Sequence, residues 1–212
     1  MTFIVGWERG PPPRCILKTM RVIAGTYRSR VLQAPKGLET RPTSDRLRET
    51  LFNVLSPRIT GAKFADLYAG SGSVGIEALS RGAEFCWFAE REPKATAAIR
   101  ANVAALKLQG GYAIEDRSVG KLLNSMVKNE RAADIVFLDP PYESGDEYRA
   151  TLDFLAHNHA IILIPNAIVV AEHSRKLPPN ERHGALTRYR LLEQGDAALS
   201  FYAIASPPSK ED

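Results

Sequence analysis

Cysteine and histidine are scarce in this sequence. Its 212 residues include two cysteines, Cys15 and Cys86, and four histidines, and no Cys-x-x-Cys pair is present. His157 and His159 are two positions apart, and residues at this spacing do not face each other on a helix. The sequence therefore suggests neither a scaffold held by disulfides nor a zinc site, and we expect no metal.

Long hydrophobic runs are absent as well. The longest apolar stretch extends from Ala160 to Ala171 and is interrupted by Pro165 and Asn166, whereas a membrane-spanning helix needs about 20 apolar residues. The first residues, MTFIVGWERGPPPR, lack the apolar core and the cleavage site of a secretory signal. We therefore expect a cytoplasmic protein without a membrane partner.

The composition is otherwise that of a soluble globular protein. Hydrophobic residues make up 44% of the chain and charged residues 25%, and the length fits one domain with a small appendage. The formal net charge is +4, and basic residues concentrate in segment 21–50. They are Arg21, Arg28, Arg30, Lys36, Arg41, Arg46 and Arg48. Because arginine-rich segments bind phosphate oxygens, we expect a nucleic acid as partner, although charge alone fits a solvated basic surface equally well.

Strand-like and helix-like segments alternate from Phe64 onward, which is typical of an α/β fold with a parallel sheet covered by helices. Strands are predicted at about residues 63–68, 84–90, 111–115, 133–138 and 167–172. Helices are predicted between them, including one at about 146–157. The last two strands, at 185–192 and 199–204, flank a turn and are predicted to be antiparallel.

Four segments are expected along the chain. Residues 1–19 contain a Pro-Pro-Pro run and are expected to be a disordered or mis-started arm, and residues 207–212 are expected to form a tail. Residues 61–206 are predicted to form the main domain. Residues 20–60 are predicted to form a hairpin and a helix that contact nucleic acid.

The hairpin and helix of this N-terminal segment can be placed from local signals. Arg21 to Ala24 and Arg30 to Gln33 have the pattern of two short strands joined by a turn. A helix is then predicted to begin after Thr43 or Ser44, either of which can cap it, and to end near Ser56-Pro57.

A glycine-rich turn follows the first predicted strand. Gly70, Gly72 and Gly75 form a GxGxxG pattern at the start of a helix. Glycine lets the backbone turn tightly and lets a ligand approach the main chain. Glu90 lies about 20 residues farther on, at the end of the second strand, where a carboxylate binds ribose hydroxyls. The pattern by itself also fits a dinucleotide site or a structural turn.

Asp66, at the end of the first strand, favours a different cofactor. A carboxylate at this position would repel the diphosphate of NAD, whereas it would attract a sulfonium that carries an α-amino group. The cationic cofactor of this kind is S-adenosylmethionine. The sequence therefore favours S-adenosylmethionine over NAD.

A second motif, Asp139-Pro140-Pro141-Tyr142, follows the apolar strand Ile135 to Leu138. It therefore belongs at the carboxyl edge of the sheet, where ligands of open α/β sheets bind. The prolines stiffen the turn and leave carbonyls and a carboxylate as acceptors, while Tyr142 offers an aromatic face. Such a turn suits a planar base with an exocyclic amine, although Asp and Pro are also common in plain loops.

Taken together, four segments resemble a known family. DLYAGSGSVGIEALSRGA and IVFLDPPY occur after RVIAGTYRSR and RPTSDRLRETLFNVL, and together they closely resemble the RsmD family of 16S ribosomal RNA guanine-N2 methyltransferases, which use S-adenosylmethionine. The resemblance covers about residues 20–205, and RPTSDRLRETLFN is its most specific part. It implies a class I methyltransferase fold, with a Rossmann-like, mostly parallel sheet of seven strands and an antiparallel last strand.

The resemblance also implies roles for individual residues. Those that would bind the cofactor are Asp66, Tyr68, Gly70, Ser71, Gly72, Gly75 and Glu90. Asp116 is the expected counterpart of the family's residue near the cofactor adenine, although the local sequence departs from the family's Gly-Asp-Ala pattern. Those that would take the guanine are Asp139, Pro140 and Tyr142.

The candidates for contacts with the RNA backbone are Arg28, Arg30, Arg41, Arg46 and Arg48. Arg46 and Arg48 can instead pair with Asp45 and Glu49 on their own helix.

The expected function is methylation of the N2 amine of a guanine in 16S rRNA, with S-adenosylhomocysteine as the second product. The expected substrate is the RNA within the small ribosomal subunit or an assembly intermediate, and the enzyme is expected to act as a monomer. Three alternatives stay open from the residues alone: a DNA adenine-N6 methyltransferase, a non-catalytic RNA-binding module and an NAD-dependent dehydrogenase.

Overall fold

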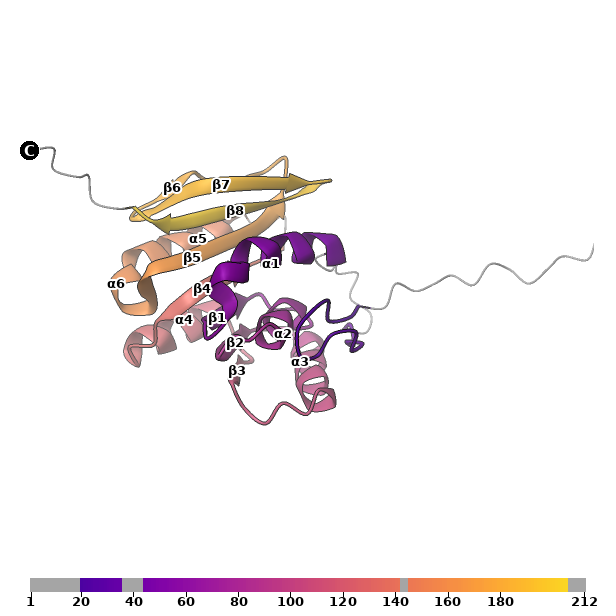
Figure 1. Ribbon diagram of the computed structural model, residues 1–212. Coiled ribbons are helices and arrows are strands. Elements are labelled where there is room, and N and C mark those ends of the chain that lie inside the picture. Colours follow the sequence, from indigo (N-terminus) through magenta and orange to yellow (C-terminus); the bar gives the residue numbers. More distant parts are fainter. Residues whose placement is uncertain (1–19, 36–43, 142–144, 206–212) are drawn as a thin grey trace, which may run out of the picture.

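A computed structural model describes residues 20–35, 44–141 and 145–205 of the chain, which form one α/β unit (Figure 1). The expected arm at 1–19, the expected tail at 207–212, Arg41 and Tyr142 lie outside these ranges. The strands form a single sheet in the order β3-β2-β1-β4-β5-β8-β7-β6.

The first five strands are parallel, as the alternation of segments predicts. Their bounds are β1 Lys63–Leu67, β2 Phe85–Ala89, β3 Tyr112–Glu115, β4 Ala133–Leu138 and β5 Leu163–Ser174. The chain builds β1 to β3 outward in one direction and then returns to place β4 and β5 on the other side of β1. The order of strands therefore reverses between β1 and β4, and ligands of such sheets bind at this point, beyond the carboxyl ends of the strands.

The remaining strands extend the sheet in antiparallel fashion. β8 (Ala197–Ile204) pairs with β5 and with β7 (Leu186–Gln194), so the predicted antiparallel pair is confirmed. A two-residue strand, β6 (Arg182–His183), pairs with the start of β7 and brings the number of strands to eight, whereas the resemblance implied seven.

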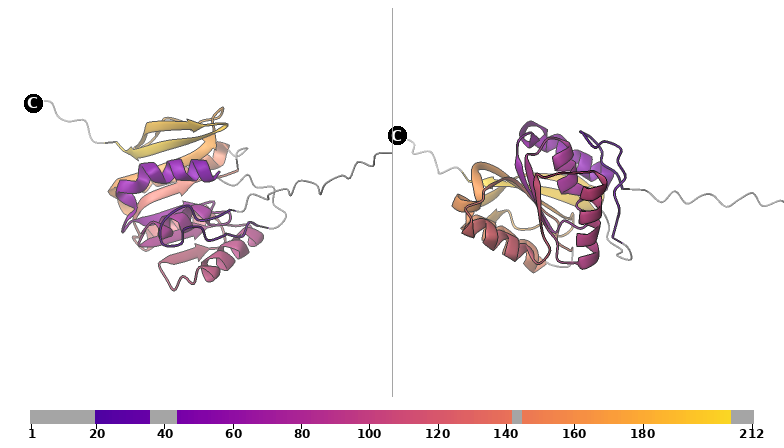
Figure 2. Two further views of the ribbon diagram at one scale, coloured as in Figure 1. Left: turned by 45° about the vertical axis from the view of Figure 1, so that its right-hand side comes forward. Right: turned by 90° about the horizontal axis from the view of Figure 1, so that it is seen from below.

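Helices cover both faces of the sheet (Figure 2). One face carries α1 (Asp45–Ile59), α2 (Ser73–Ser80) and α3 (Pro93–Ala105), and the other carries α4 (Val119–Lys128), α5 (Gly145–His157) and α6 (His159–Ile162). Side chains alternate along each strand, so Phe64 packs toward the first face and Ala65 toward the second. Among the described residues, none of the helices is long and apolar enough to span a membrane.

The helix α1 begins as predicted and extends farther than predicted. The Ser44 side chain caps it by accepting a hydrogen bond from the Leu47 amide at 3.1 Å. The helix continues through Pro57 to Ile59, although an end near Ser56-Pro57 was expected. Ile59 is 4% exposed in the core, and its burial offsets the backbone hydrogen bond that Pro57 cannot make.

Residues 20–35, which we call the strap, bring the two segments of the predicted hairpin together in antiparallel fashion, but without regular strands. An isolated antiparallel bridge joins Arg21 to Val31, and the Leu32 amide donates to the Met20 carbonyl at 2.8 Å. The strap is thus a closed turn with a single bridge in place of two regular strands. It lies beside α2 and α3 (Figure 1) and buries Val22 and Leu32.

Candidate functional site

A cavity of about 900 Å³ opens at the carboxyl ends of β1, β2 and β4. The residues that follow these strands line it, among them Tyr68, Glu90 and Asp139. Helices α4 and α5 supply a second part of the wall and the strap supplies a third, through Met20, Ala34 and Pro35. A volume at the upper end of the range for small-molecule sites leaves room for a cofactor and part of a second ligand.

The glycines of the turn after β1 have different roles. Gly70 lines the cavity with φ of +56°, and a Cβ placed on it would meet no atom within 4 Å. Its open backbone can therefore cradle a ligand, with Ser71 beside it in the wall. Gly75 does not line the cavity, and a Cβ there would lie 2.3 Å from the Phe88 ring, so this glycine lets α2 pack against β2. Gly72 does not line the cavity either and has φ of +76°.

Asp66 serves both the turn and the cavity. Its Oδ2 accepts a hydrogen bond from the Gly75 amide at 2.8 Å, and the residue is 1% exposed. Burial, and to a smaller degree the charge of Glu90, raises the pKa of Asp66 to about 8, although the Gly75 amide favours the ionised form. The ionised carboxylate is therefore costly until a cation shares its surroundings. The buried Asp66 carboxylate therefore fits a cofactor with a positive charge.

Glu90 lies at the end of β2 and lines the cavity, as predicted for a ribose-binding carboxylate. Its Oε2 accepts from the Gly70 amide at 2.8 Å, and its Oε1 accepts from the Glu92 amide at 2.8 Å. Each carboxylate oxygen has a second acceptor position that a hydroxyl group can use. The two amides hold the carboxylate in place beside the glycine turn.

Tyr68 links the turn after β1 to α5. It has φ of +63°, which is uncommon for a residue other than glycine. Its hydroxyl lies 2.9 Å from the Thr151 hydroxyl, and both residues line the cavity. Burial raises the pKa of Tyr68, so the hydroxyl stays neutral and can both donate and accept a hydrogen bond.

Asp139, Pro140 and Pro141 line the cavity directly after β4. No donor among the described residues reaches the Asp139 carboxylate, in contrast to Asp66 and Glu90. Burial, and then the charges of Glu172 and Asp66, raises the pKa of Asp139 well above its usual range. The Asp139 carboxyl group is therefore an acceptor available to a ligand. The Pro140 carbonyl lies 3.3 Å from the Tyr148 hydroxyl and keeps a second acceptor position.

Two residues that support this turn were not predicted from the sequence. Glu172 is 3% exposed on β5 and lies next to Asp139, because Leu138 and Ala171 are paired in the parallel register of β4 and β5. The Tyr148 hydroxyl, on α5, donates to the Glu172 carbonyl at 2.7 Å and to the Pro140 carbonyl at 3.3 Å. Glu172 could have been found in the same way as Asp66 and Asp139, because it is an acid at the end of a predicted apolar strand.

The start of α4 lines the cavity where Asp116 was expected to do so. Asp116 itself does not line it and pairs with Arg100, with 3.0 Å between Oδ2 and Nη2. The residues of this helix that line the cavity are Ser118, Val119, Gly120 and Leu123. Ser118 is the N-cap of α4, and a capping serine after a predicted strand is the signal that could have indicated this wall.

The candidate RNA-binding arginines separate into two groups. Arg28 and Arg30 on the strap are exposed, and so is Arg46 in the first turn of α1. Arg41 lies outside the described residues.

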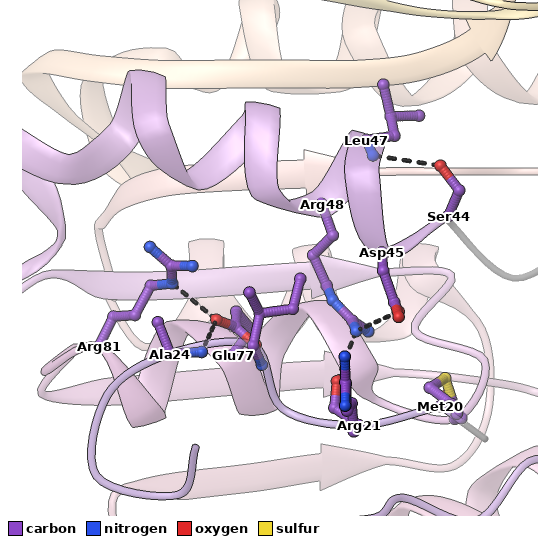
Figure 3. Close-up of polar contacts among 11 residues, drawn as sticks. Met20, Arg21, Ala24, Ser44, Asp45, Leu47, Arg48, Glu77 and Arg81 are labelled. Atoms are coloured by element: carbon purple, nitrogen blue, oxygen red, sulfur yellow. Dashed lines mark hydrogen bonds and ion pairs between the residues drawn. The ribbon is translucent and has the colours of Figure 1, made fainter. Parts of the chain in front are cut away.

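Arg48 is buried, which contradicts its prediction as an RNA contact. Its side chain is 0% exposed, and Nη2 donates to the Arg21 carbonyl at 2.6 Å and to Asp45 Oδ1 at 3.0 Å (Figure 3). The reason is helical geometry: Arg48 precedes Leu51 and Phe52 by three and four positions, so it shares the face of α1 that packs on the core. The alternative pairing with Asp45 is the one observed.

Comparison with known proteins gives consistent matches. A family model described as conserved hypothetical protein 95 matches residues 20–203. The chain is 37% identical over 175 residues to the ribosomal RNA small subunit methyltransferase D of Escherichia coli (strain K12), with 82% of this chain and 86% of that protein covered. It is 36% identical over 183 residues to YlbH of Bacillus subtilis (strain 168), with 86% of this chain and 98% of that protein covered.

A solved structure shares the fold. The structure of yhhF from Escherichia coli superposes with a TM-score of 0.76 at 29% sequence identity, and the match covers 89% of this chain and 99% of that one. The similarity therefore extends over the strap, α1 and the sheet together.

Proposed function

The chain belongs to the RsmD family, and from this premise we propose that it transfers a methyl group from S-adenosylmethionine to the N2 amine of a guanine in small-subunit ribosomal RNA. The observation that carries the proposal is one cavity lined both by the glycine turn and by Asp139 and Pro140. Family membership supports the cofactor and the class of RNA. The chemistry of the Asp139 turn supports an amine as acceptor.

The cofactor half of the cavity consists of Asp66, Tyr68, Gly70, Ser71 and Glu90. Glu90 would hold ribose hydroxyls, and the open backbone at Gly70 would let the cofactor approach the turn. When bound, S-adenosylmethionine supplies an electrophilic methyl group on a positively charged sulfur. Asp66 would favour this charge, because a nearby cation lowers the pKa that burial has raised.

The other half of the cavity is suited to an amine that must become a nucleophile. The nitrogen lone pair of the guanine amine is delocalised into the ring. Hydrogen bonds from this amine to the Asp139 carboxylate and the Pro140 carbonyl would favour a pyramidal nitrogen and direct its lone pair away from the two acceptors. Positive charge develops on the nitrogen as the nitrogen–carbon bond forms and the methyl–sulfur bond breaks. This nearby positive charge lowers the pKa that burial has raised, so Asp139 would stabilise it as a carboxylate. The proton is then released to Asp139 or to water.

The geometry also sets a requirement on the substrate. A base inside a helix cannot reach a cavity at the sheet edge, so the target guanine would be unpaired or extruded. Tyr142 would replace the stacking that the base loses. Arg28, Arg30 and Arg46 would contact the RNA backbone. We further propose that the substrate is 16S rRNA in the small subunit or in an assembly intermediate, and that the enzyme acts as a monomer in the cytoplasm.

The test is methylation of deproteinised 16S rRNA and of small subunits, both from cells that lack the modification, with duplex DNA assayed alongside as the alternative acceptor. The protein is incubated with methyl-labelled cofactor, and the labelled nucleoside is identified by mass spectrometry. We expect N2-methylguanosine from one of the two substrates. Label in N6-methyladenine of duplex DNA would contradict the proposal, and retention of RNA and cofactor without any label would indicate an RNA-binding module instead.

A further inference from the structure

The strap joins the candidate RNA-binding surface to the cofactor cavity. Its exposed turn carries Arg28 and Arg30, whereas its two ends line the cavity through Met20 and through Ala34 and Pro35. A shift of the strap would therefore change both the RNA-facing cations and the wall of the cofactor site.

The part of the strap between these ends is anchored on α2 and α1 by buried charged side chains (Figure 3). Glu77 accepts hydrogen bonds from the Ile23 amide at 2.7 Å and the Ala24 amide at 2.9 Å, and Arg81 pairs with it at 2.7 Å. Arg48 holds the Arg21 carbonyl. Glu77 and Arg48 do not line the cavity, so these anchors hold residues 21–24 of the strap without touching a ligand there, and the end near Gln33 depends on other contacts.

The end of the strap near Gln33 is held by Asn102, on α3. Asn102 Oδ1 accepts from the Gln33 amide at 2.7 Å, and Nδ2 donates to the Gln33 carbonyl at 3.1 Å. Nδ2 also donates to the Ser71 carbonyl, in the glycine turn, at 3.0 Å. Asn102 is 1% exposed, so no water competes for these bonds. One side chain thus holds the strap and the glycine turn together.

A second contact joins the same two segments. The Ser71 hydroxyl lies 3.5 Å from the Met20 sulfur, at the other end of the strap. Ser71, Met20 and the residues after Gln33 all line the cavity. A ligand in this part of the cavity can therefore contact both segments that Asn102 connects.

We propose that Asn102 is a positioning residue that couples the strap to the glycine turn, so that cofactor and RNA each increase the affinity for the other. The inference rests on the proposed function, because it takes Arg28 and Arg30 as RNA contacts. A cofactor against Ser71 and Ala34 selects one position of the strap, and RNA on the arginines selects the same position. Each ligand then binds a strap that the other has already ordered, and linkage requires the two effects to be equal.

The coupling is measured as a ratio of dissociation constants. The RNA used is whichever of the two substrates is methylated, deproteinised 16S rRNA or the small subunit. Its affinity is determined with and without saturating S-adenosylhomocysteine, and the affinity for S-adenosylhomocysteine is determined with and without saturating RNA. We expect both ratios to be equal and about fivefold or more, the lower end of ordinary allosteric coupling. Asn102→Ala should bring both ratios close to one, while each ligand still binds alone.

Two variants serve as matched controls. Gln33→Ala removes a side chain but leaves the backbone groups that Asn102 binds, and Arg100→Ala breaks an exposed ion pair on the same helix. Both should keep the full coupling. If Asn102→Ala does not fold, Asn102→Leu is used for the test, because leucine fills nearly the same volume without a charge and removes the donor and the acceptor.

The outcomes separate this inference from the proposed function. Coupling ratios of one in the unaltered protein, or full coupling in the Asn102 variants, would overturn the role of Asn102 while leaving the methyltransferase activity standing. Failure of the unaltered protein to bind RNA at all would overturn both. Loss of coupling confined to the Asn102 variants would support the inference.

Discussion

The acidic residues at the carboxyl ends of β1 and β2 differ from the one that follows β4. Asp66 and Glu90 accept hydrogen bonds from backbone amides of the glycine turn and its neighbours. Asp139 receives no hydrogen bond from any described residue and lies beside a second buried acid, Glu172. The first two carboxylates therefore stabilise the turn that we propose holds the cofactor, whereas the acceptor capacity of the third would be available to a substrate.

Asp139→Ala tests the substrate side of this comparison most strongly. The variant removes the group that would stabilise charge on the amine, and we expect the methylation rate at saturating substrates to fall about 100-fold or more, by analogy with the loss of one oxyanion-hole donor. Affinity for S-adenosylhomocysteine should stay within a factor of about two, since the cofactor contacts lie in the other half of the cavity. Single-turnover rates and calorimetric titration measure the two effects.

Asp146→Ala is the matched control for this variant. Asp146 is 94% exposed and does not line the cavity. An unchanged single-turnover rate in Asp139→Ala would remove Asp139 from the reaction.

Two glycine variants distinguish an effect on protein stability from an effect on cofactor binding. Gly75→Ala places a methyl group 2.3 Å from the Phe88 ring, so we expect a loss of about 1–3 kcal/mol in the free energy of unfolding. Gly70→Ala meets no atom within 4 Å and strains only the backbone, so its stability loss should be smaller while its affinity for the cofactor falls more. Denaturant unfolding and cofactor titration compare the two. A Gly70→Ala protein that binds the cofactor normally would contradict the assignment.

The charge of Asp66 predicts a dependence on pH. Its pKa is raised from 3.8 to about 8 in the folded protein, so the stability that the protonated form provides is lost as pH rises toward and through 8. A cationic ligand favours the ionised form. The affinity for S-adenosylmethionine relative to the uncharged-sulfur product should therefore rise with pH, by at most about tenfold per pH unit.

Asp66→Asn is the variant that tests this dependence. It keeps an acceptor for the Gly75 amide and should flatten both the stability profile and the affinity ratio. Equal pH profiles for the variant and the unaltered protein would assign the dependence to another group.

The smallest expected effects concern the arginines. Replacing Arg28 or Arg30 with Ala should lower the slope of log affinity for RNA against log salt by about one for each phosphate that the variant no longer neutralises. Arg48→Ala should leave the slope unchanged and instead destabilise the fold, because it frees the Arg21 carbonyl and Asp45. Binding titrations over a range of salt concentrations distinguish the two. A lowered slope in Arg48→Ala would mean that this residue reaches the RNA.

Much of the candidate site was predictable because it follows one rule. Acids and glycines directly after apolar strands meet at the carboxyl edge of a parallel sheet, and this rule brought Asp66, Glu90 and Asp139 to the cavity. Asp116, which only the family resemblance had placed near the cofactor adenine, does not line the cavity, because the start of α4 lines it there and Asp116 pairs with Arg100 instead.

The remaining features depend on tertiary packing. The contact of Asn102 with Gln33 joins residues 69 positions apart, and no local pattern announces it. Arg48 was a candidate RNA contact because it belongs to the arginine-rich segment 21–50, yet its place on α1 faces the core. The extension of α1 to Ile59 likewise follows from burial of its last residue.

The pairing of β1 with β4 fixes the distance between the two turns of the candidate site. Leu67 and Leu138 are register partners, so the two turns leave the sheet from neighbouring positions on strands about 4.8 Å apart. Backbone hydrogen bonds fix this spacing, and no rotation of a side chain can alter it. Under the proposed function, the segments that cover the cavity could therefore be replaced to accommodate a new acceptor molecule, while the sheet would keep the turn proposed for the methyl donor beside the turn proposed for the acceptor.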